Sequence, residues 1–399
     1  MREIVFVDGY RSAFGRNGGS LRGFAGSEIA AKVLRGLLDR TGIMERGGVD
    51  AVYAGCALKD SIAVDPARYA MLEAGMPVEI PATFVEMQCG SAITAINNAA
   101  CCMAMGMFDV AIVGGMESWS RRVALFPTWT EPYRQIPPIA IPERLAPTDE
   151  ENIPMLQVSD GLARQWDISR EECDEYACMS QHRLAEAYQK GITGSEIIPI
   201  VIPATRKTPE IIVDKDEFPR PQTTMEGLAK LKSVLPGGVT TAGNASGMND
   251  GAAFLLMMTR EKAEELGYVP MARWVSGCAV GVRPSLMGIG PAYSALKALS
   301  MAGLSVEDVD VFECNEAFAS QNLAVRKEME KQSGRPIDME KWNPNGGAIS
   351  IGHPNGASGA RIGMFAMRQL ELTGGRYGVF SSCCGGGHGT TTVIENLRY

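Results

Sequence analysis

The first reactive group in the chain is a cysteine that precedes a run of small residues. In the segment VEMQCGSAITA, Cys89 is followed by Gly90, Ser91 and apolar residues that predict a helix. A thiol at a helix N-terminus faces unpaired N–H groups and the positive end of the dipole, which favour the thiolate and lower the pKa of the thiol. This position predicts a nucleophile. A buried, inert cysteine is the alternative that the segment alone leaves open.

A glycine- and asparagine-rich loop carries a histidine. In NPNGGAISIGHPNGASGAR, five glycines and three asparagines surround His353, and no regular helix or strand is expected before about Ala357. Glycine and asparagine tolerate positive φ and allow close approach to a ligand, while Pro354 fixes the turn after the histidine. An imidazole held there could be the base for a cysteine and a donor to a thioester oxygen. A loop histidine that is hydrogen-bonded only to backbone is the alternative.

Two further segments place polar groups at the ends of buried strands. In SSCCGGGHGTT, a strand leads into Cys383, Cys384 and three glycines whose N–H groups could form an anion-binding nest. Because three consecutive glycines cost backbone entropy, an oxyanion hole is favoured over a flexible turn. In ECNEAFA, Asn315 follows the strand VDVF and could hold a catalytic water or an oxyanion. An ordinary strand-to-helix turn is its alternative.

The elements that position these groups are duplicated. The stretch SEIAAKVLRGLLDRTGI…VDAVYAGC resembles PAYSALKALSMAGL…VDVFECNEAF. When Gly42 is aligned with Gly303, Cys89 falls on Ser350, three residues before His353. In both copies, a helix of small residues and then a buried strand follow the reactive segment. The pattern predicts a duplicated α/β unit with largely buried sheets.

The region between the copies is different in character. It is rich in Pro, Arg and aromatic residues and contains a capped helix, SREECDEYACMSQHRLAEAYQKG. We expect its Pro-rich part to be an ordered loop over the site, with disorder as the alternative. The expected organisation is an N-terminal half at 1–117, an inserted loop or cap region at 118–239, the end of the N-terminal half with a linker at 240–270, and a C-terminal half at 271–399.

Composition narrows the function classes. The chain has 399 residues, 45% of them hydrophobic, which is enough for a large core. Its net charge of -8 and the lack of a basic, aromatic-interleaved run argue against nucleic-acid binding. No apolar run is long enough to span a bilayer, and no secretory signal pattern opens the chain. Ten irregularly spaced cysteines indicate a reducing compartment, which we expect to be the cytoplasm. The chain has three histidines and no paired C-x-x-C motifs, so no metal site is predicted.

Taken together, the motifs resemble the thiolase family over nearly the full length of the chain. They are QCGSA around Cys89, GGMES at 114–118, TAGNASGMNDGAA at 241–253, NEAFA at 315–319, GGAISIGHPNGASGAR at 346–361 and CCGGGHG at 383–389. The resemblance implies an α/β fold, a five-layered αβαβα sandwich of two similar halves, in agreement with the duplication. It also implies a coenzyme A-dependent acyltransferase that cleaves 3-oxoacyl-CoA thiolytically or performs the reverse Claisen condensation.

The resemblance also implies roles for individual residues. Cys89 would take the acyl group while His353 receives its proton, and Cys383 would be the second acid/base. The C-x-G-G-G register selects Cys383 rather than the cysteine after it. One oxyanion hole would combine His353 with a water held by Asn315, and the other would use the backbone N–H groups of Cys89 and Gly385.

Coenzyme A is expected as a co-substrate, with no tightly bound cofactor. Thiolases carry its phosphates at the surface, and neither a P-loop nor a dinucleotide fingerprint is present. By resemblance, Ser246, Phe318, Met155 and Arg220 are candidates to line the channel. A merely solvated arginine is the alternative for Arg220.

Three positions depart from the family pattern. Glu86 stands where Asn is frequent, Pro154 where a His often precedes Met155, and His388 where Gln or Met is common. His388 could tune Cys383 or contact the substrate. The inserted region adds aromatic and arginine residues, which are Trp129, Tyr133, Arg122, Arg134 and Arg144. We hypothesise a bulky, aromatic or carboxylate-bearing 3-oxoacyl-CoA, as in a thiolase of aromatic degradation that cleaves benzoylsuccinyl-CoA, with a small accessory subunit as a further expectation.

Three other functions stay open at this point. One is acetyl-CoA C-acetyltransferase activity on acetoacetyl-CoA. A second is a 3-oxoacyl synthase of the same fold, which would use two histidines and decarboxylate malonyl thioesters. The third is a non-catalytic acyl-CoA-binding subunit, in which Cys89 would not react with a haloacetyl thioester. The expected partners are acyl-CoA, coenzyme A and further copies of the chain, in a homodimer or a dimer of dimers.

Overall fold

The structure, a computed structural model, describes residues 2–127 and 139–398. Its core is a mixed sheet made of two half-sheets. In spatial order, the N-terminal half-sheet contains β1 (Ile4–Ser12), β9 (Asn249–Thr259), β5 (Val110–Glu117), β3 (Ala51–Gly55) and β4 (Ala82–Val85). The C-terminal half-sheet contains β10 (Ala272–Gly281), β13 (His388–Asn396), β12 (Tyr377–Cys384) and β11 (Val309–Cys314). A short antiparallel ladder between β1 and β10 joins the halves, which repeat the same strand order outward from that seam.

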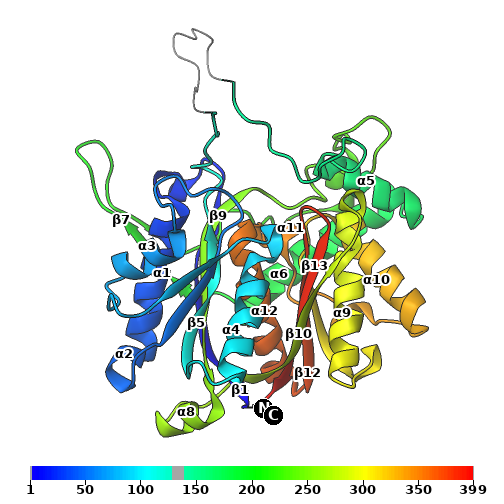
Figure 1. Cartoon of the computed structure of the whole chain (residues 1–399). Helices are drawn as coiled ribbons and strands as arrows, with labels where there is room; N and C mark the ends of the chain where they lie inside the picture. Colours follow the sequence, from blue (N-terminus) through cyan, green and yellow to red (C-terminus); the bar gives the residue numbers. More distant parts are fainter. Residues whose placement is uncertain (1, 128–138, 399) are drawn as a thin grey trace.

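Helices form three layers around the half-sheets. Two of them, α4 (Ser91–Ala104) and α12 (Asn355–Thr373), pack against each other and against strands of both halves. On the outer faces lie α1 (Gly26–Thr41) and α3 (Pro66–Glu73) on one side, and α9 (Gly290–Met301) with α10 (Ala319–Ser333) on the other. Figure 1 shows α1–α3 and α9–α10 at opposite sides, with α4 and α12 between them. The predicted five-layered αβαβα sandwich of two similar halves is confirmed.

The residue pattern explains why outer and central helices differ. The outer helix α1 buries one apolar stripe, including Ile29, Val33 and Leu37, and ends at Gly42 with φ of 62°. In contrast, α12 is buried nearly all round and is built from small residues. A Cβ at Gly359 would lie 2.8 Å from the backbone nitrogen of Ile93 in α4, so the close approach of the two central helices requires glycine there.

The remaining elements are short or belong to the inserted region. They are η1 (Ser20–Gly23), β2 (Gly15–Arg16), α2 (Ile43–Arg46), η2 (Gln88–Gly90), α5 (Met155–Gln165), α6 (Arg170–Gln189), β6 (Ile197–Ile198), β7 (Ile200–Ile202), β8 (Ile211–Val213), α7 (Met225–Ala229), α8 (Arg260–Glu265), η3 (Pro284–Ile289), η4 (Val306–Asp308), η5 (Met339–Lys341) and α11 (Ala348–Ile351).

The inserted region packs on both halves. Its helices α5 and α6 lie against α10, while β6 pairs in parallel with β1. The predicted capped helix is α6, which begins after Ser169 with a capping box closed by Glu172. Residues 123–127 and 139–143 run outward from the body (Figure 1), whereas Leu145 lies beside Gly385 and Ala146 is buried. Three residues of the aromatic and arginine set lie outside the described residues: Trp129, Tyr133 and Arg134. Within the described ranges, the helices are too short or too polar to cross a membrane.

Candidate active site

The turn that carries Cys89 joins the edge strand β4 to the central helix α4. Cys89 lies in η2, directly before the helix, as predicted, and its side chain is buried. Gln88 has a φ of 48°, which turns the chain sharply at this point. The Ser91 hydroxyl holds the turn, since it accepts from the Met87 N–H at 2.9 Å and donates to the Gln88 carbonyl at 2.7 Å. Asn355 donates from Nδ2 to the Cys89 sulfur at 3.0 Å.

The protonation state of Cys89 differs from the prediction. Burial raises the pKa of the Cys89 thiol to about 11, and this effect exceeds that of the Asn355 N–H, which lowers it. The expectation of a lowered pKa at the helix N-terminus is therefore wrong for the unliganded protein. Desolvation disfavours the thiolate more strongly than the local donors favour it. Cys89 is a neutral thiol near pH 7, and a base has to remove its proton.

The hydrogen bonds of His353 decide which of its ring nitrogens can accept a proton. The Ser358 hydroxyl donates to the Pro354 carbonyl at 3.0 Å, so its oxygen accepts from His353 Nδ1 at 2.6 Å. The proton of the neutral ring is thereby held on Nδ1, and the lone pair lies on Nε2. Burial and the Arg361 guanidinium lower the pKa of His353 to about 3, so the imidazole is neutral at physiological pH. The helix after it begins at Asn355, earlier than the predicted Ala357, and α11 forms one turn before it.

Asn315 lies beside His353, at the end of β11. Its backbone N–H donates to the Ser381 carbonyl at 2.9 Å, and its Nδ2 is 3.4 Å from His353 Nε2. Within the described ranges, its side-chain Oδ1 is buried and has no hydrogen-bond donor. Buried polar atoms normally have partners. The free carbonyl is therefore suited to accept from a water or a substrate group, the role that the sequence assigned to Asn315.

The two cysteines at the end of β12 are both buried near Cys89, the predicted nucleophile. The turn that carries Cys89, Gln88–Gly90, is named the nucleophile turn. Burial, followed by interaction with Cys89, raises the pKa of Cys383 and of Cys384 well above the usual value. Cys384 lies against the nucleophile turn, because a Cβ at Gly90 would be 2.4 Å from its sulfur. Its sulfur also lies 3.7 Å from the Ser382 carbonyl. Because Cys384 is engaged with main chain, Cys383 is the better candidate for moving a proton.

The glycine turn after these cysteines connects β12 to β13. Gly386 and Gly387 have φ values of 84° and 91°, a backbone conformation that side chains rarely adopt. A Cβ at Gly387 would lie 2.3 Å from the Val282 carbonyl oxygen. Gly385 lies against Gln88, since a Cβ there would be 3.2 Å from its Cγ. The predicted nest thus adjoins the nucleophile turn, and η2 packs on both β12 and α12.

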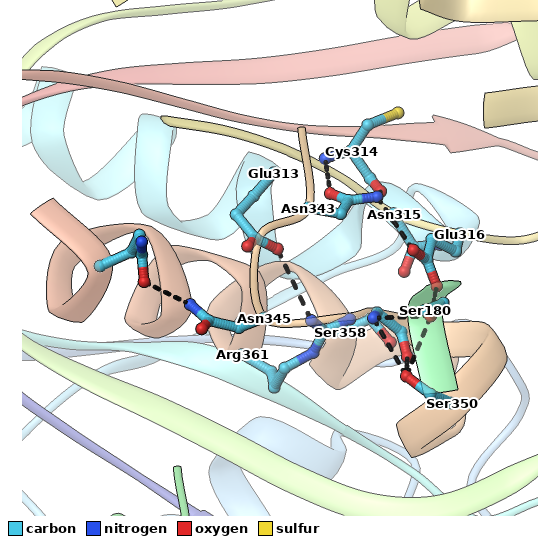
Figure 2. A network of polar contacts seen from close by, with 12 residues as sticks. Ser180, Glu313, Cys314, Asn315, Glu316, Asn343, Asn345, Ser350, Ser358 and Arg361 are labelled. Atoms are coloured by element: carbon cyan, nitrogen blue, oxygen red, sulfur yellow. Dashed lines mark hydrogen bonds and ion pairs between the residues drawn. The ribbon is translucent and has the colours of Figure 1, made fainter. Parts of the chain in front are cut away.

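A buried polar network ties the Asn315 turn to the histidine loop (Figure 2). Glu316 accepts from the Ser180 hydroxyl at 2.7 Å and from the Ile349 N–H at 3.2 Å. Asn343 donates to the same carboxylate at 3.2 Å and accepts from the Cys314 N–H at 2.8 Å. Glu316 therefore fixes the two segments relative to each other. Sequence reasoning missed this residue, although an acidic residue between Asn315 and the apolar end of the NEAFA motif was a signal for it.

A second buried pair lies behind the histidine. Glu313 and Arg361 face each other (Figure 2), with Oε2 and Nη1 separated by 3.8 Å. Both are fully buried, and burial raises the pKa of Glu313 to about 8 and lowers that of Arg361 to about 10. In the described parts of the chain, the charged atoms of both have no close hydrogen bond. The two charged groups therefore lack close hydrogen bonds and are also excluded from water, so burying them is costly.

The residues predicted to contact coenzyme A are only partly brought together. Ser246 donates its backbone N–H to the Ala317 carbonyl at 3.0 Å, and Phe318 forms a bridge with Ala245. A further bridge joins Met248 to His353. Phe318 and Met155, the first residue of α5, pack on the same hydrophobic cluster.

The other two candidates are at the surface. Arg220 is exposed, with its guanidinium 5.0 Å from the ring centroid of Phe218. His388 is the exposed first residue of β13 and lies opposite Cys384 in the ladder. Glu86 is exposed at the other side of the nucleophile turn, where it accepts from the Gln88 N–H at 2.7 Å. Glu86 and His388 thus flank the buried cysteines from the solvent side.

Family models and individual relatives match almost the whole chain. The thiolase N-terminal domain matches residues 4–261, and the thiolase C-terminal domain matches residues 268–396. An acetyl-CoA acetyltransferase of Allochromatium vinosum is 39% identical, with 99% of each chain covered. A beta-ketoadipyl-CoA thiolase of Acinetobacter baylyi is also 39% identical, with both chains fully covered.

Solved structures agree with these matches. The Bacillus anthracis acetyl-CoA acetyltransferase has a TM-score of 0.90 at 37% identity, covering 100% of this chain and 99% of the other. Human mitochondrial 3-ketoacyl-CoA thiolase has a TM-score of 0.89 at 35% identity, with 99% of each chain covered. This chain belongs to the thiolase family and is an acyltransferase that uses coenzyme A as a co-substrate, in thiolytic cleavage of a 3-oxoacyl-CoA or the reverse Claisen condensation.

Proposed function

We propose that Cys89 is the acyl-carrying nucleophile, His353 its base and Cys383 the second acid/base. The observation that carries this proposal is the state of the imidazole. Ser358 holds the proton of His353 on Nδ1, and burial keeps the ring neutral. The lone pair is then on Nε2, which faces the Asn315 amide at 3.4 Å, and this is the ring nitrogen that can accept a proton from a thiol that burial keeps protonated.

In the cleavage direction, the Cys89 proton moves to His353 Nε2 and the sulfur electron pair forms a bond to the 3-oxo carbon. The backbone N–H groups of Cys89 and Gly385 stabilise the resulting oxyanion. Collapse breaks the bond between C2 and C3 and leaves an acyl thioester on Cys89. The electron pair left on C2 is delocalised onto the thioester oxygen, which His353 and a water held by Asn315 stabilise, until Cys383 protonates C2. After the shortened acyl-CoA product leaves, coenzyme A gives its proton to the Cys383 thiolate, and its sulfur forms a bond to the acyl carbon. The bond between that carbon and the Cys89 sulfur then breaks, and His353 returns its proton to the Cys89 thiolate.

Mass spectrometry after brief exposure to acyl-CoA donors tests these assignments. We expect one acyl adduct, located on the peptide that contains Cys89, and no adduct in Cys89→Ala. Cys101→Ser is a matched control, because Cys101 lies on α4, the helix that follows Cys89, but is exposed. An adduct that stays in Cys89→Ala, or no adduct with any donor, would refute the proposal. The second result would instead support a non-catalytic acyl-CoA-binding subunit.

For the substrate, we propose a bulky or carboxylate-bearing 3-oxoacyl-CoA. Support comes from His388, which replaces a frequent family residue and lies exposed opposite Cys384. The beta-ketoadipyl-CoA thiolase among the relatives is named for a carboxylate-bearing substrate, although the acetyl-CoA acetyltransferase is equally similar. A panel of kcat/KM values decides, and a preference for acetoacetyl-CoA over every larger substrate would overturn this proposal in favour of the acetyltransferase. An aromatic substrate and an accessory subunit stay predictions.

For assembly, we propose a homodimer formed through the edge strand β4, alone or within a dimer of dimers. This strand ends the N-terminal half-sheet, and Phe84 on it is 38% exposed, close in sequence to the exposed Val78. Exposed apolar edges favour pairing with another chain. Analytical ultracentrifugation of Phe84→Lys tests it, with Val269→Lys, a more exposed apolar site away from β4, as the control. An unchanged mass for Phe84→Lys would contradict it. We also propose a cytoplasmic location, supported by ten cysteines without a disulfide pattern.

A further inference from the structure

An amide side chain outside the predicted site residues contacts the reacting sulfur. Asn355, the first residue of α12, donates from Nδ2 to Cys89 Sγ at 3.0 Å. The two residues are 266 positions apart and belong to different halves of the fold. Among the described residues, no other side chain hydrogen-bonds this sulfur. The contact therefore depends on how α12 docks on the nucleophile turn.

A tryptophan determines which way this amide points. The indole Nε1–H of Trp119 donates to Asn355 Oδ1 at 2.7 Å. An indole nitrogen can only donate, so the acceptor must be the amide oxygen. The amide NH₂ is therefore directed at the Cys89 sulfur, and a flipped amide would place two donors against each other at Trp119.

The start of α12 is anchored from the same side. Trp119 follows β5 by two residues, and Glu117 at the end of β5 accepts from the Gly356 N–H at 3.1 Å. The ring of Trp119 also packs under the guanidinium of Arg122, 5.4 Å from its centroid. The Asn355 amide is thus held by a chain of fixed groups rather than by solvent.

Resting on the assignment of Cys89 as nucleophile, we propose that Asn355 is a catalytic residue, which stabilises the thiolate of Cys89 by N–H donation, and that Trp119 is a positioning residue that fixes its amide. When the Cys89 proton moves to His353, a negative charge develops on a sulfur from which water is largely excluded. The N–H of Asn355 interacts more strongly with that charged sulfur than with the thiol. Once the sulfur has formed its bond to the acyl carbon, this charge is gone and the interaction weakens. Asn355 therefore assists proton removal and not the later protonation of C2.

The direct test is alkylation of Cys89 by iodoacetamide across pH 6 to 10, followed by peptide mass spectrometry. This reaction reads the thiolate population and needs no acyl-CoA. Asn355→Leu keeps the approximate size but has no donor, and we expect alkylation to slow about 10- to 100-fold at each pH, the usual effect of one hydrogen bond to a charged group. Asn355→Asp retains the acceptor for Trp119 and adds a negative charge beside the sulfur, so we expect a slowing at least as large.

Trp119→Phe separates positioning from direct contact. Without the indole N–H, the amide can turn away, and we expect a smaller slowing of the same sign. The double variant Trp119→Phe/Asn355→Leu should react no more slowly than Asn355→Leu alone, because Trp119 acts only through Asn355. Trp166→Phe is the matched control, since the indole of Trp166 donates to Glu328 at 3.1 Å, on the side of α10. It should react like the wild type.

Two results would overturn the inference: alkylation of Asn355→Leu and Asn355→Asp at the wild-type rate, or additive effects in the double variant. Thermal melts confirm that each variant is folded before its rate is interpreted. Failure of the underlying mechanism gives a different result, namely a wild-type protein whose Cys89 is never acylated by acyl-CoA. The alkylation rates would then still report whether Asn355 acts on the thiol.

Discussion

Replacing Ser358 with alanine should slow catalysis without removing any group that contacts the substrate. The Ser358 oxygen accepts from His353 Nδ1 at 2.6 Å and thereby keeps the lone pair on Nε2. In Ser358→Ala, the ring either leaves a buried N–H without a partner or changes to the tautomer that carries its proton on Nε2. An unsatisfied buried donor costs about 1–3 kcal/mol. At 1.36 kcal/mol per factor of ten, kcat for thiolysis should fall about 5- to 150-fold.

The assay for this prediction is thiolysis of acetoacetyl-CoA, or of the best substrate found, with kcat and KM determined separately. The loss should appear in kcat, because Ser358 does not bind substrate. Ser294→Ala is a matched control, since Ser294 is equally buried. In the described structure, its hydroxyl bonds Pro291 on α9 and Thr391 on β13. An unchanged kcat in a folded Ser358→Ala variant would refute the account of the histidine tautomer.

Three further outcomes are expected. The alkylation rate of Cys89 should rise about tenfold per pH unit up to pH 9, because a pKa of about 11 leaves the thiolate a minority that grows with pH; a plateau below pH 8 would contradict this. Cys383→Ser should still be acylated, but the rate at which the α-protons of acetyl-CoA exchange with solvent should fall about 10²-fold or more. Cys384→Ser should keep this exchange rate, and the reverse result would exchange the two assignments. At pH 9, between the pKa of about 8 of Glu313 and that of about 10 of Arg361, Glu313→Ala leaves the buried Arg361 charge without its ionised partner and should lower the free energy of unfolding by about 3–5 kcal/mol in denaturant titrations. Glu313→Met/Arg361→Met should recover much of it, and equal stability of Glu313→Ala and the wild type at that pH would contradict this reading of the pair.

The internal repeat predicted a duplicated α/β unit, and the family resemblance implied how its layers are stacked. The equivalence of Gly42 and Gly303 marks the ends of α1 and α9, which lie on the two outer faces of the sandwich. Helices of small residues were predicted after Cys89 and His353, and the close contact of α4 with α12 at Gly359 requires glycine there. Local pattern was informative here because helix period, glycine caps and strand hydrophobicity depend on neighbours a few positions away.

The residues that we propose to react were all named from the sequence, but their ionisation was not predicted. Cys89 lies directly before a helix, as its segment predicted, yet its thiol is protonated because burial raises its pKa more than the Asn355 amide and the backbone N–H lower it. His353 is neutral for the same reason, a property that no spacing in the sequence indicates. Desolvation depends on how completely distant segments cover a group, and only the folded chain contains that information.

Partners from distant segments were the other property decided by tertiary structure. The amide of Asn355 reaches Cys89 from the opposite half, and Trp119 orients that amide from the end of a third segment. Each residue looked ordinary within its own motif. The sequence by itself determined the fold and which groups could react, because both follow from local patterns. The packing of two halves against each other decided which donors meet the sulfur and which charges are excluded from water, because these depend on distances of a few ångströms between residues far apart in the chain.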